Sequence, residues 1–274
     1  MPYFQKSVQF TPPNTSKRAA NASAQYNPAA FSSTGGPLHV SYPNYAAPFS
    51  SWMERGMRAI GIADVQDFNS GTLLGSQYPS VTIRPSDETR SSAESSFIQT
   101  ALKEGNPNLN IYTETMAQRV LFDGDKTATG VEVRSTGLTY RIHAAKEVIL
   151  SAGAFQSPQL LMLSGIGPAS MLAQFDIPVV VDLPGVGQNM WDHIFFGPSY
   201  RVRVDTFTRV ARDPVYLAEQ LVNYTLNKNG PLANNVVDYL GFERVPDSYL
   251  GNFTAEAQRD LAGFPDDWPH IEVG

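Results

Sequence analysis

Cysteine is absent from the 274-residue chain, and histidine is scarce. Without cysteine the chain cannot form a disulfide, a thiolate nucleophile, an iron–sulfur cluster or a cysteine-ligated zinc site. The four histidines, His39, His143, His193 and His270, are too far apart for any two to lie within one or two turns of a helix. A histidine-based metal site would have to take its ligands from distant segments, so we expect no metal.

Long apolar runs and an excess of positive charge are also missing. No stretch approaches the roughly 20 apolar residues that span a bilayer, and residues 1–14 lack the apolar run of a secretory signal. Lys and Arg number 20 against 26 Asp and Glu, a net charge of −6, with no long basic run. We therefore expect neither a membrane nor a nucleic-acid partner. The sequence carries no signal for the oligomeric state.

Four Asn-x-Ser/Thr sequons are present, at Asn14, Asn21, Asn223 and Asn252. They are compatible with passage through a glycosylating compartment. In a chain this rich in Asn, Ser and Thr, chance is the favoured explanation, so the cellular location stays open.

Hydrophobic residues make up 42% of the chain, enough for a sizeable core. Residues 12–50 are rich in Pro, Ser, Asn, Gly and Ala, which predicts a surface excursion that buries little, with an extended piece at 38–40. Apolar spacing predicts a helix over 49–60. A second helix is expected to begin after Pro85, with Ser86 as N-cap and Asp87 and Glu88 in its first turn.

Short apolar or alternating segments separated by Asp-Gly and Thr-Gly turns predict one sheet from residues 109 to 150. The expected strands lie at 109–112, 119–122, 130–134, 140–142 and 146–150. Residues 148–150 are uniformly apolar, as in a strand covered on both faces, and should lead through small residues 151–154 into a helix with Ser157 as N-cap and Pro158 in its first turn. That geometry favours a dinucleotide ligand at the carboxyl end of the strand.

The rest of the chain continues the mixed pattern and predicts an α/β fold overall. We expect a short helix at 169–175, a strand at 179–181, a strand region at 194–204, an amphipathic helix over 215–226, and entry into a strand at 266–271.

The block Ser151–Pro168, SAGAFQSPQLLMLSGIGP, resembles the second signature of the glucose–methanol–choline (GMC) oxidoreductases, which are flavin-dependent alcohol oxidases and dehydrogenases. The resemblance continues through Asp182–Asn189 and Trp191–His193. Segments at 2–7, 35–40, 90–93 and 108–113 resemble the family in the same order, so the similarity covers essentially the whole chain.

The resemblance implies FAD as cofactor and oxidation of a CH–OH group of an alcohol or a secondary-metabolite intermediate, with hydride transfer to the flavin. It assigns Ala117 to a backbone contact with adenine, although an ordinary strand alanine is equally compatible. The small turn at Ala152 and Gly153 would let the backbone approach the dinucleotide. Asn189, Asp192 and His193 match the segment that lies against the flavin, and His193 is not the family's catalytic base.

By the same resemblance the chain corresponds to the central portion of a GMC protein. The family's opening Gly-x-Gly-x-x-Gly unit and its closing segment with the catalytic histidine match nothing in the printed sequence, so no catalytic residue is expected in it. We expect residues 1–80 to form an intermediate excursion and linker, 81–193 an incomplete Rossmann-like FAD-binding domain, and 194–274 the start of an antiparallel-sheet substrate domain. The alternative is a truncated, inactive chain with only a binding or vestigial role, colourless and poorly stable when purified.

Overall fold

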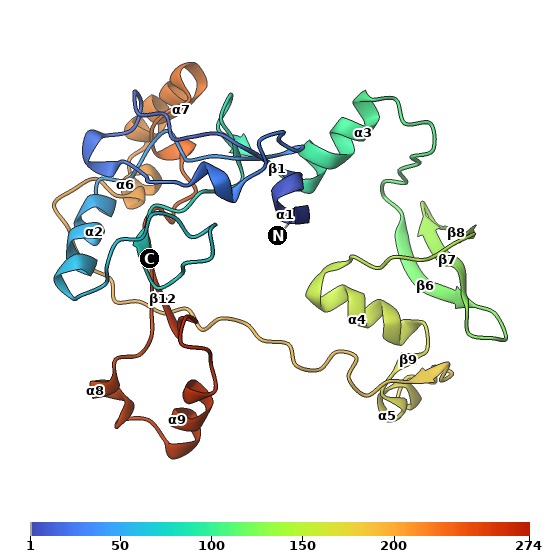
Figure 1. Cartoon of the computed structure of the whole chain (residues 1–274). Helices are drawn as coiled ribbons and strands as arrows, with labels where there is room; N and C mark the ends of the chain where they lie inside the picture. The colour runs from blue at the N-terminus through green and yellow to red at the C-terminus, as the bar shows by residue number, and fades with distance from the viewer. Residues whose placement is uncertain (1) are drawn as a thin grey trace. The chain divides into compact units, whose positions relative to one another are not determined.

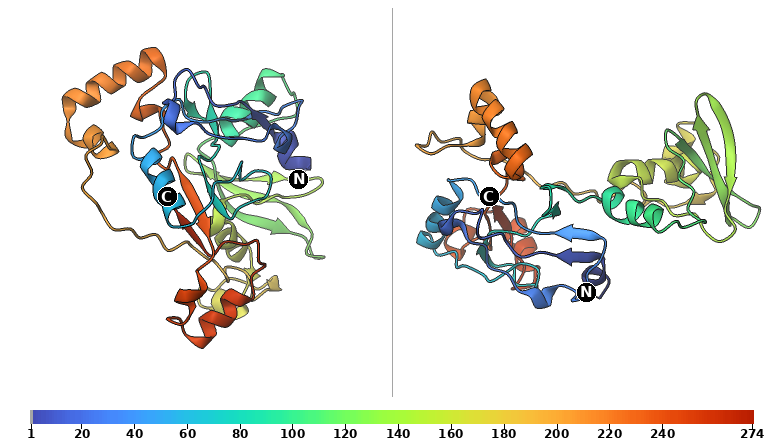
Figure 2. Two further views of the ribbon diagram at one scale, coloured as in Figure 1. Left: turned by 60° about the vertical axis from the view of Figure 1, so that its left-hand side comes forward. Right: turned by 90° about the horizontal axis from the view of Figure 1, so that it is seen from above.

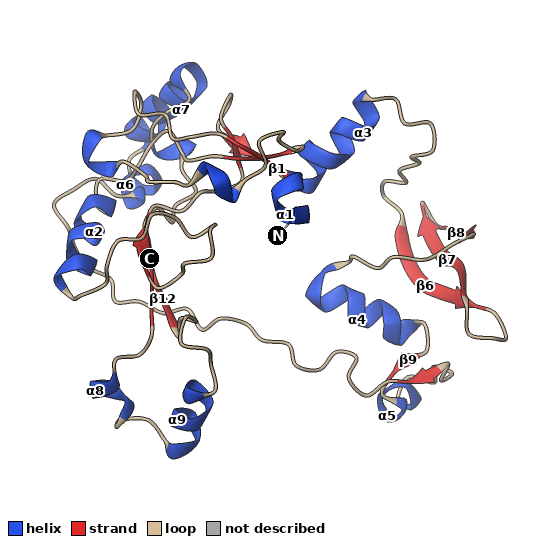
Figure 3. Ribbon diagram, viewed as in Figure 1, coloured by secondary structure: helices blue, strands red, loops and turns tan. Residues whose placement is uncertain are grey.

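The computed structural model describes residues 2–274 and divides into two compact units. Unit 1 runs up to Pro107 and resumes at Tyr200, and unit 2 is Asn108–Ser199. Both contain helices and small sheets (Figure 3), which confirms the expected mixed α/β class. The expected division at 80/81 and 193/194 concerns function and stays a prediction.

Unit 1 contains most of the elements. In chain order they are α1 (Pro2–Ser7), β1 (Val8–Phe10), η1 (Ala20–Ala22), η2 (Pro28–Ala30), β2 (Leu38–Val40), α2 (Ser50–Ala59), β3 (Gly75–Gln77), β4 (Ile83–Arg84), β5 (Thr89–Arg90), the π-helical turn η3 (Glu94–Ile98), α3 (Gln99–Lys103), α6 (Phe207–Arg212), α7 (Pro214–Asn227), η4 (Pro231–Ala233), β11 (Leu240–Glu243), α8 (Asp247–Leu250), α9 (Ala255–Ala262) and β12 (Ile271–Val273). None of the helices in residues 2–274 combines the length and hydrophobicity that crossing a bilayer requires.

Three small sheets organise unit 1. Strands β1 and β2 pair in parallel with Val8 opposite Leu38, and β4 and β5 form an antiparallel pair. Strand β11 lies between β3 and β12 and is antiparallel to both, with Gly241 opposite Ser76 and Val273. Strand β3 belongs to the first stretch of unit 1, and β11 and β12 belong to the second, so this sheet joins the two stretches.

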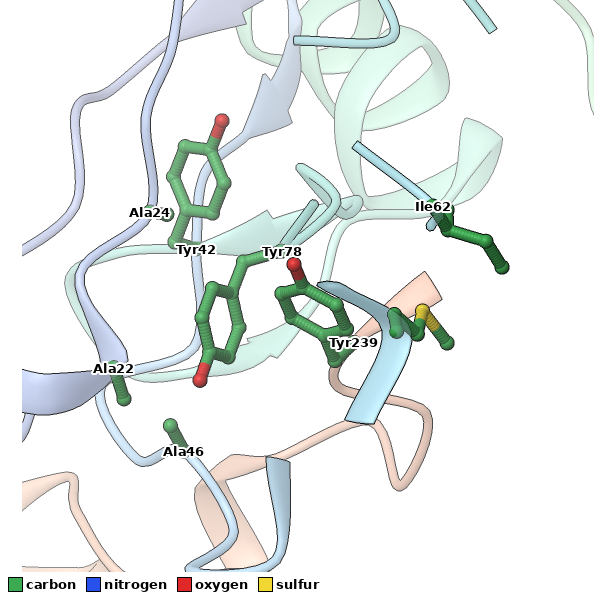
Figure 4. Packing of buried hydrophobic residues seen from close by; sticks show 8 residues of the cluster. Ala22, Ala24, Tyr42, Ala46, Ile62, Tyr78 and Tyr239 are labelled. Atoms are coloured by element: carbon green, nitrogen blue, oxygen red, sulfur yellow. The ribbon is translucent and has the colours of Figure 1, made fainter. Parts of the chain in front are cut away.

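The core of unit 1 is built largely from small and aromatic residues (Figure 4). Its buried members are Ala22, Ala24, Tyr42, Ala46, Met57, Ile62, Tyr78 and Tyr239. The rings of Tyr78 and Tyr239 meet edge to face, with centroids 4.8 Å apart. Half of this cluster lies within residues 12–50, so the expectation that this excursion buries little is wrong. Alanines pack closely because they are small, and tyrosines bury a large ring area.

Two of the expected helices of unit 1 are confirmed. Helix α2 ends just before Gly61, whose φ of 98° suits glycine. Helix α7 begins at Pro214 after Asp213, whose carboxylate accepts the Tyr216 N–H at 3.0 Å. The prediction of a helix that begins at Ser86 is wrong. Residues 83–90 form the β4–β5 hairpin instead, and helical structure starts at Glu94.

Unit 2 is a sheet with a helix packed against it and a small parallel bridge (Figures 1 and 2). Its elements are β6 (Met116–Phe122), β7 (Ala128–Ser135), β8 (Leu138–His143), α4 (Gly153–Leu163), β9 (Ile166–Gly167), α5 (Ala169–Ala173) and β10 (Val181–Asp182). Strands β6, β7 and β8 form an antiparallel meander with Val131 opposite Val120 and Ile142. These three strands were expected from the sequence.

The strand expected at 179–181 forms in part as β10, whereas three other strands expected around unit 2 do not form. Residues 109–112, 147–150 and 194–200 are extended or irregular chain without partner strands, and Ile149 is 76% exposed. The short apolar run at 148–150 therefore predicts a buried strand wrongly, because a strand needs hydrogen-bonded neighbours and no strand pairs with it. Helix α4 also begins four residues before the expected N-cap, at Gly153.

Candidate functional site

The N-terminal end of α4 is open to solvent. Ala152 precedes the helix, and Gly153, its first residue, has a φ of 90°, which favours glycine. A Cβ at Gly153 would meet no atom within 4 Å, so space in front of this turn is free. The Ala152 N–H donates to Ser157 Oγ at 2.9 Å. Ser157 thus stabilises the turn from inside the helix and is not the expected N-cap.

A buried serine at the other end of α4 ties this helix to the sheet. Ser164 Oγ accepts the Val120 N–H of β6 at 2.8 Å and donates to Leu160 O at 2.5 Å. Val120 and Leu160 are buried beside this bond. Ala117 lies nearer the start of β6, opposite Val133 of β7, and is exposed. The strand that carries Ala117 and the helix that begins at Gly153 are therefore one packed element pair.

The segment after β10 packs on the same helix through a glycine turn. A Cβ at Gly187 would lie 3.7 Å from Met162 Cε and 3.9 Å from Pro158 Cβ, both on α4. Two residues later Asn189 adopts a left-handed φ of 55°. From there the chain is extended, and Asn189, Asp192 and His193 are all exposed.

All six residues predicted to bind the cofactor lie in unit 2 and are exposed. The structure brings Ala152 and Gly153 together at the start of α4, and connects Ala117 to the same helix through β6. Asn189 follows directly on a turn that touches α4. No hydrogen bond within the described chain holds Asp192 or His193 in place, so their role against a flavin stays a prediction.

A second polar centre, which the sequence did not reveal, lies inside unit 1. Arg18, Asn44, Glu88 and Asp238 are all buried. Glu88 Oε2 accepts the Asn44 N–H at 2.8 Å, and its Oε1 has no partner among the described residues. Burial raises the pKa of Glu88 to about 7, although the Asn44 N–H acts in the opposite direction. Because these residues come from four separate segments, no local spacing could have indicated the cluster.

The histidines occupy four unrelated positions. His143 is exposed at the end of β8, His193 is exposed in the extended segment, and His39 and His270 are half-buried in unit 1. Burial lowers the pKa of both half-buried imidazoles. Within residues 2–274 no three histidine or acidic side chains gather as metal ligands would.

A sequence profile of the GMC oxidoreductases matches residues 13–195. Among characterised proteins, the chain is 48% identical over 271 residues to dehydrogenase pkfF of Emericella nidulans, which covers 99% of this chain and 43% of that protein. It is 46% identical to versicolorin B synthase of Aspergillus parasiticus, over 98% of this chain and 41% of the relative. It is 43% identical to patulin synthase of Aspergillus clavatus, over 99% of this chain and 43% of that relative. The chain thus spans less than half the length of these relatives.

Solved structures with the same arrangement are also known. An FAD-dependent oxidoreductase from Chaetomium thermophilum, solved with a bound fragment, superposes with a TM-score of 0.80 at 29% identity, covering 96% of this chain and 46% of that one. A formate oxidase superposes with a TM-score of 0.72 at 26% identity, and the match covers 99% of this chain and 46% of the oxidase. A fungal aryl-alcohol oxidase shares the fold at 23% identity and a TM-score of 0.80, and the match covers 99% of this chain and 51% of the oxidase.

Proposed function

The chain belongs to the GMC oxidoreductase family, and we propose that it serves an FAD-dependent oxidation of a CH–OH group in an alcohol or a secondary-metabolite intermediate. FAD is the cofactor that the family membership supports. The observation that carries the proposal is the open first turn of α4, which follows Ser151 and Ala152 inside the block that matches the family.

The residues of that turn fit a dinucleotide. An α-helix leaves its first N–H groups without intrahelical partners and carries a partial positive charge at that end, which suits a pyrophosphate. The first turn of α4 is exposed and holds no acidic residue. Gly153 leaves free space where a side chain would stand. We therefore assign the pyrophosphate to the backbone N–H groups of the first turn from Gly153 onward, because the Ala152 N–H already donates to Ser157 Oγ.

The other candidate residues would position the adenine and the flavin of the cofactor. Ala117 offers backbone groups on an exposed strand for adenine, and Asn189, Asp192 and His193 offer polar side chains for the flavin. Bound FAD would accept the hydride of the alcohol. None of these residues is assigned the catalytic base, so this chain's own part is to bind and orient the cofactor.

A flavin titration tests the proposal. FAD is added to the purified 274-residue chain, and binding is followed by the change in flavin fluorescence. We expect Gly153→Ala to weaken binding by about tenfold or more, because the methyl group strains the turn and enters the free space. The matched control is Gly137→Ala. Gly137 has a φ of 86° and also meets nothing within 4 Å, but it lies in the β7–β8 turn. Equal losses in both variants, or no FAD binding to the parent chain, would contradict the proposal.

The second candidate function is a chain that binds FAD but does not catalyse the oxidation, because none of the residues assigned above is a catalytic base. Anaerobic addition of primary and aryl alcohols to the FAD-loaded chain separates the two. Bleaching of the flavin absorbance supports an active oxidoreductase. Stoichiometric FAD that no alcohol bleaches supports the binding role.

A further inference from the structure

Unit 1 contains a polar cleft of about 610 Å³ that shares no residue with the proposed flavin site. Its walls come from the loop before η1, the loop into α2, and the segment α6–α7–η4. The volume is in the range of sites for small organic ligands. What distinguishes the cleft is the chemistry of its walls.

The charge of the cleft is one-sided. Although the chain has 26 acidic and 20 basic residues, the lining contains Lys17 and Arg18 and neither Asp nor Glu. Neither cation forms an ion pair with another described residue. Neither Lys17 nor Arg18 therefore has a carboxylate at ion-pair distance. A cleft lined by such cations attracts an anion.

Two buried carboxylates, Asp238 and Glu88, act on Arg18 through space without forming an ion pair with it. Asp205 pairs with Arg209 at 3.0 Å. Asp238 accepts from Ser50 Oγ at 2.8 Å and from Asn234 Nδ2 at 2.9 Å. None of these three carboxylates lines the cleft, and none lies within ion-pair distance of Lys17 or Arg18.

Arg18 is built into the wall and fixed there. Only 6% of its surface is exposed. Its Nε donates to Ala22 O at 2.9 Å and its Nη1 to Pro43 O at 2.7 Å, while the buried Nη2 has no partner in the described chain. A buried guanidinium keeps its charge, and a charge in a low-dielectric wall acts more strongly than one in water. The Arg18 Cζ lies 5.0 Å from the centroid of the Tyr78 ring, so this guanidinium acts on a ligand in the cleft through its charge.

Lys17 supplies donors that a ligand can reach. Its Nζ donates to Asn227 O at 2.6 Å, which uses one of the three N–H donors of an ammonium group. The lysine is half-buried, in contrast to Arg18. The two residues thus combine a fixed charge with an accessible one.

Aromatic rings form the remainder of the recognition surface. Tyr45, Trp52 and Tyr216 line the cleft, and Trp52 is 56% exposed. Burial raises the pKa of Tyr45 to about 12, so its phenol stays protonated at neutral pH and can donate a hydrogen bond. Tyr45 and Tyr216 are half-buried, so Trp52 offers the exposed ring. An aromatic surface beside positive charge suits a planar ligand that stacks and also carries a negative group.

We propose that this cleft binds a small planar aromatic anion, an aromatic carboxylate or phenolate. The ring lies among Tyr45, Trp52 and Tyr216, and the anionic oxygen is bound by Lys17 Nζ and attracted by the buried charge of Arg18. This binding does not depend on FAD, so the test is made without flavin.

Two probes of the same shape and different charge test it. Calorimetric titration of the full 274-residue chain compares 4-hydroxybenzoate with 4-hydroxybenzamide. We expect the benzoate to bind at least about tenfold more tightly, the difference that one charge interaction near a protein surface provides. Raising the ionic strength should reduce that difference.

A substitution that changes charge and keeps shape locates the site. Gln220 of α7 lines the cleft, and its Oε1 accepts from Asn223 Nδ2 at 3.5 Å. Gln220→Glu keeps that oxygen and adds a negative charge. We expect it to weaken benzoate binding about tenfold and to leave benzamide binding unchanged. The matched control is Gln258→Glu on α9, outside the cleft, which should change neither.

Equal affinity for the two probes, no binding of benzoate, or equal effects of the two glutamate variants would overturn the proposal. Far-UV circular dichroism verifies that both variants are folded. Should Gln220→Glu fail to fold, Lys17→Gln, which removes one of the two cations, must weaken benzoate and spare benzamide. Loss of FAD binding in Gly153→Ala is measured on a different unit and a different ligand, so the two proposals fail independently.

Discussion

Glu88 combines three unfavourable features at one residue. It is buried, its backbone φ of 57° lies in the left-handed region, and its Oε1 has no partner in the described chain. A carboxylate in such surroundings resists ionisation, and burial raises its pKa from 4.5 to about 7. The folded chain therefore holds this proton more tightly than the unfolded chain does.

This shift makes stability depend on pH in a defined direction. Below about pH 4.5 both states carry the proton, and the group has no effect. As the pH rises from about 4.5 to about 7 the unfolded state ionises first, so the free energy of unfolding falls, and above pH 7 the loss stays constant. We expect Glu88→Gln to remove on the order of 1–3 kcal/mol of this fall between pH 5 and pH 8. Urea unfolding at the two pH values measures it.

Glu219→Gln on the exposed surface of α7 is the control for this experiment. It should leave the difference between pH 5 and pH 8 as it is in the parent chain. The explanation from Glu88 is wrong if Glu88→Gln and the parent chain lose the same free energy of unfolding over that interval.

At the scale of elements, the sequence predicts well those that are defined by neighbours along the chain. Helices α2 and α7 were expected because each has apolar residues at helical spacing within one short segment. The meander β6–β7–β8 was expected because the turn signals Asp123-Gly124 and Thr136-Gly137 separate its three short strands. These features need no knowledge of distant parts of the chain.

Elements that depend on distant partners were predicted poorly. The run at 148–150 is as apolar as a buried strand, yet nothing in those three residues specifies a neighbour to pair with. Ser86 resembles an N-cap, yet Ile83 and Arg90 pair across it and form a hairpin. In the candidate site the small residues Ala152 and Gly153 could be read from the sequence, whereas the buried serine that positions their helix could not.

Ser164 offers a test of that positioning. Ser164→Ala removes the acceptor of the Val120 N–H and leaves this buried group unpaired between α4 and β6. We expect a loss of about 1–3 kcal/mol in the free energy of unfolding and faster hydrogen exchange at Val120.

Ser170→Ala in α5 is the matched control, since Ser170 is exposed and its hydroxyl makes no hydrogen bond in the described chain. Its effect should stay within about 0.5 kcal/mol. If Ser164→Ala destabilises the chain no more than Ser170→Ala does, the serine does not couple the helix to the sheet.

At the scale of the whole molecule, unit 2 leaves an unusual amount of aromatic surface in water. Trp191, Phe195 and Phe196 are 91%, 97% and 85% exposed and follow one another in extended chain. Single exposed apolar residues are ordinary, but a contiguous group of large ones marks an interaction surface or a tendency to self-associate.

We therefore expect the 274-residue chain to bind the dye ANS and to self-associate as its concentration rises. Because Phe195 and Phe196 contribute almost nothing to a core, the double substitution Phe195→Ser and Phe196→Ser should lower both effects and change the free energy of unfolding by less than about 0.5 kcal/mol. Sedimentation velocity and urea unfolding measure the two quantities. Phe253→Ser, at an exposed aromatic residue of unit 1, controls for the loss of a ring elsewhere. If the double variant loses stability together with its self-association, these rings pack against the chain in solution, and the extended segment 190–196 is part of the folded core of unit 2.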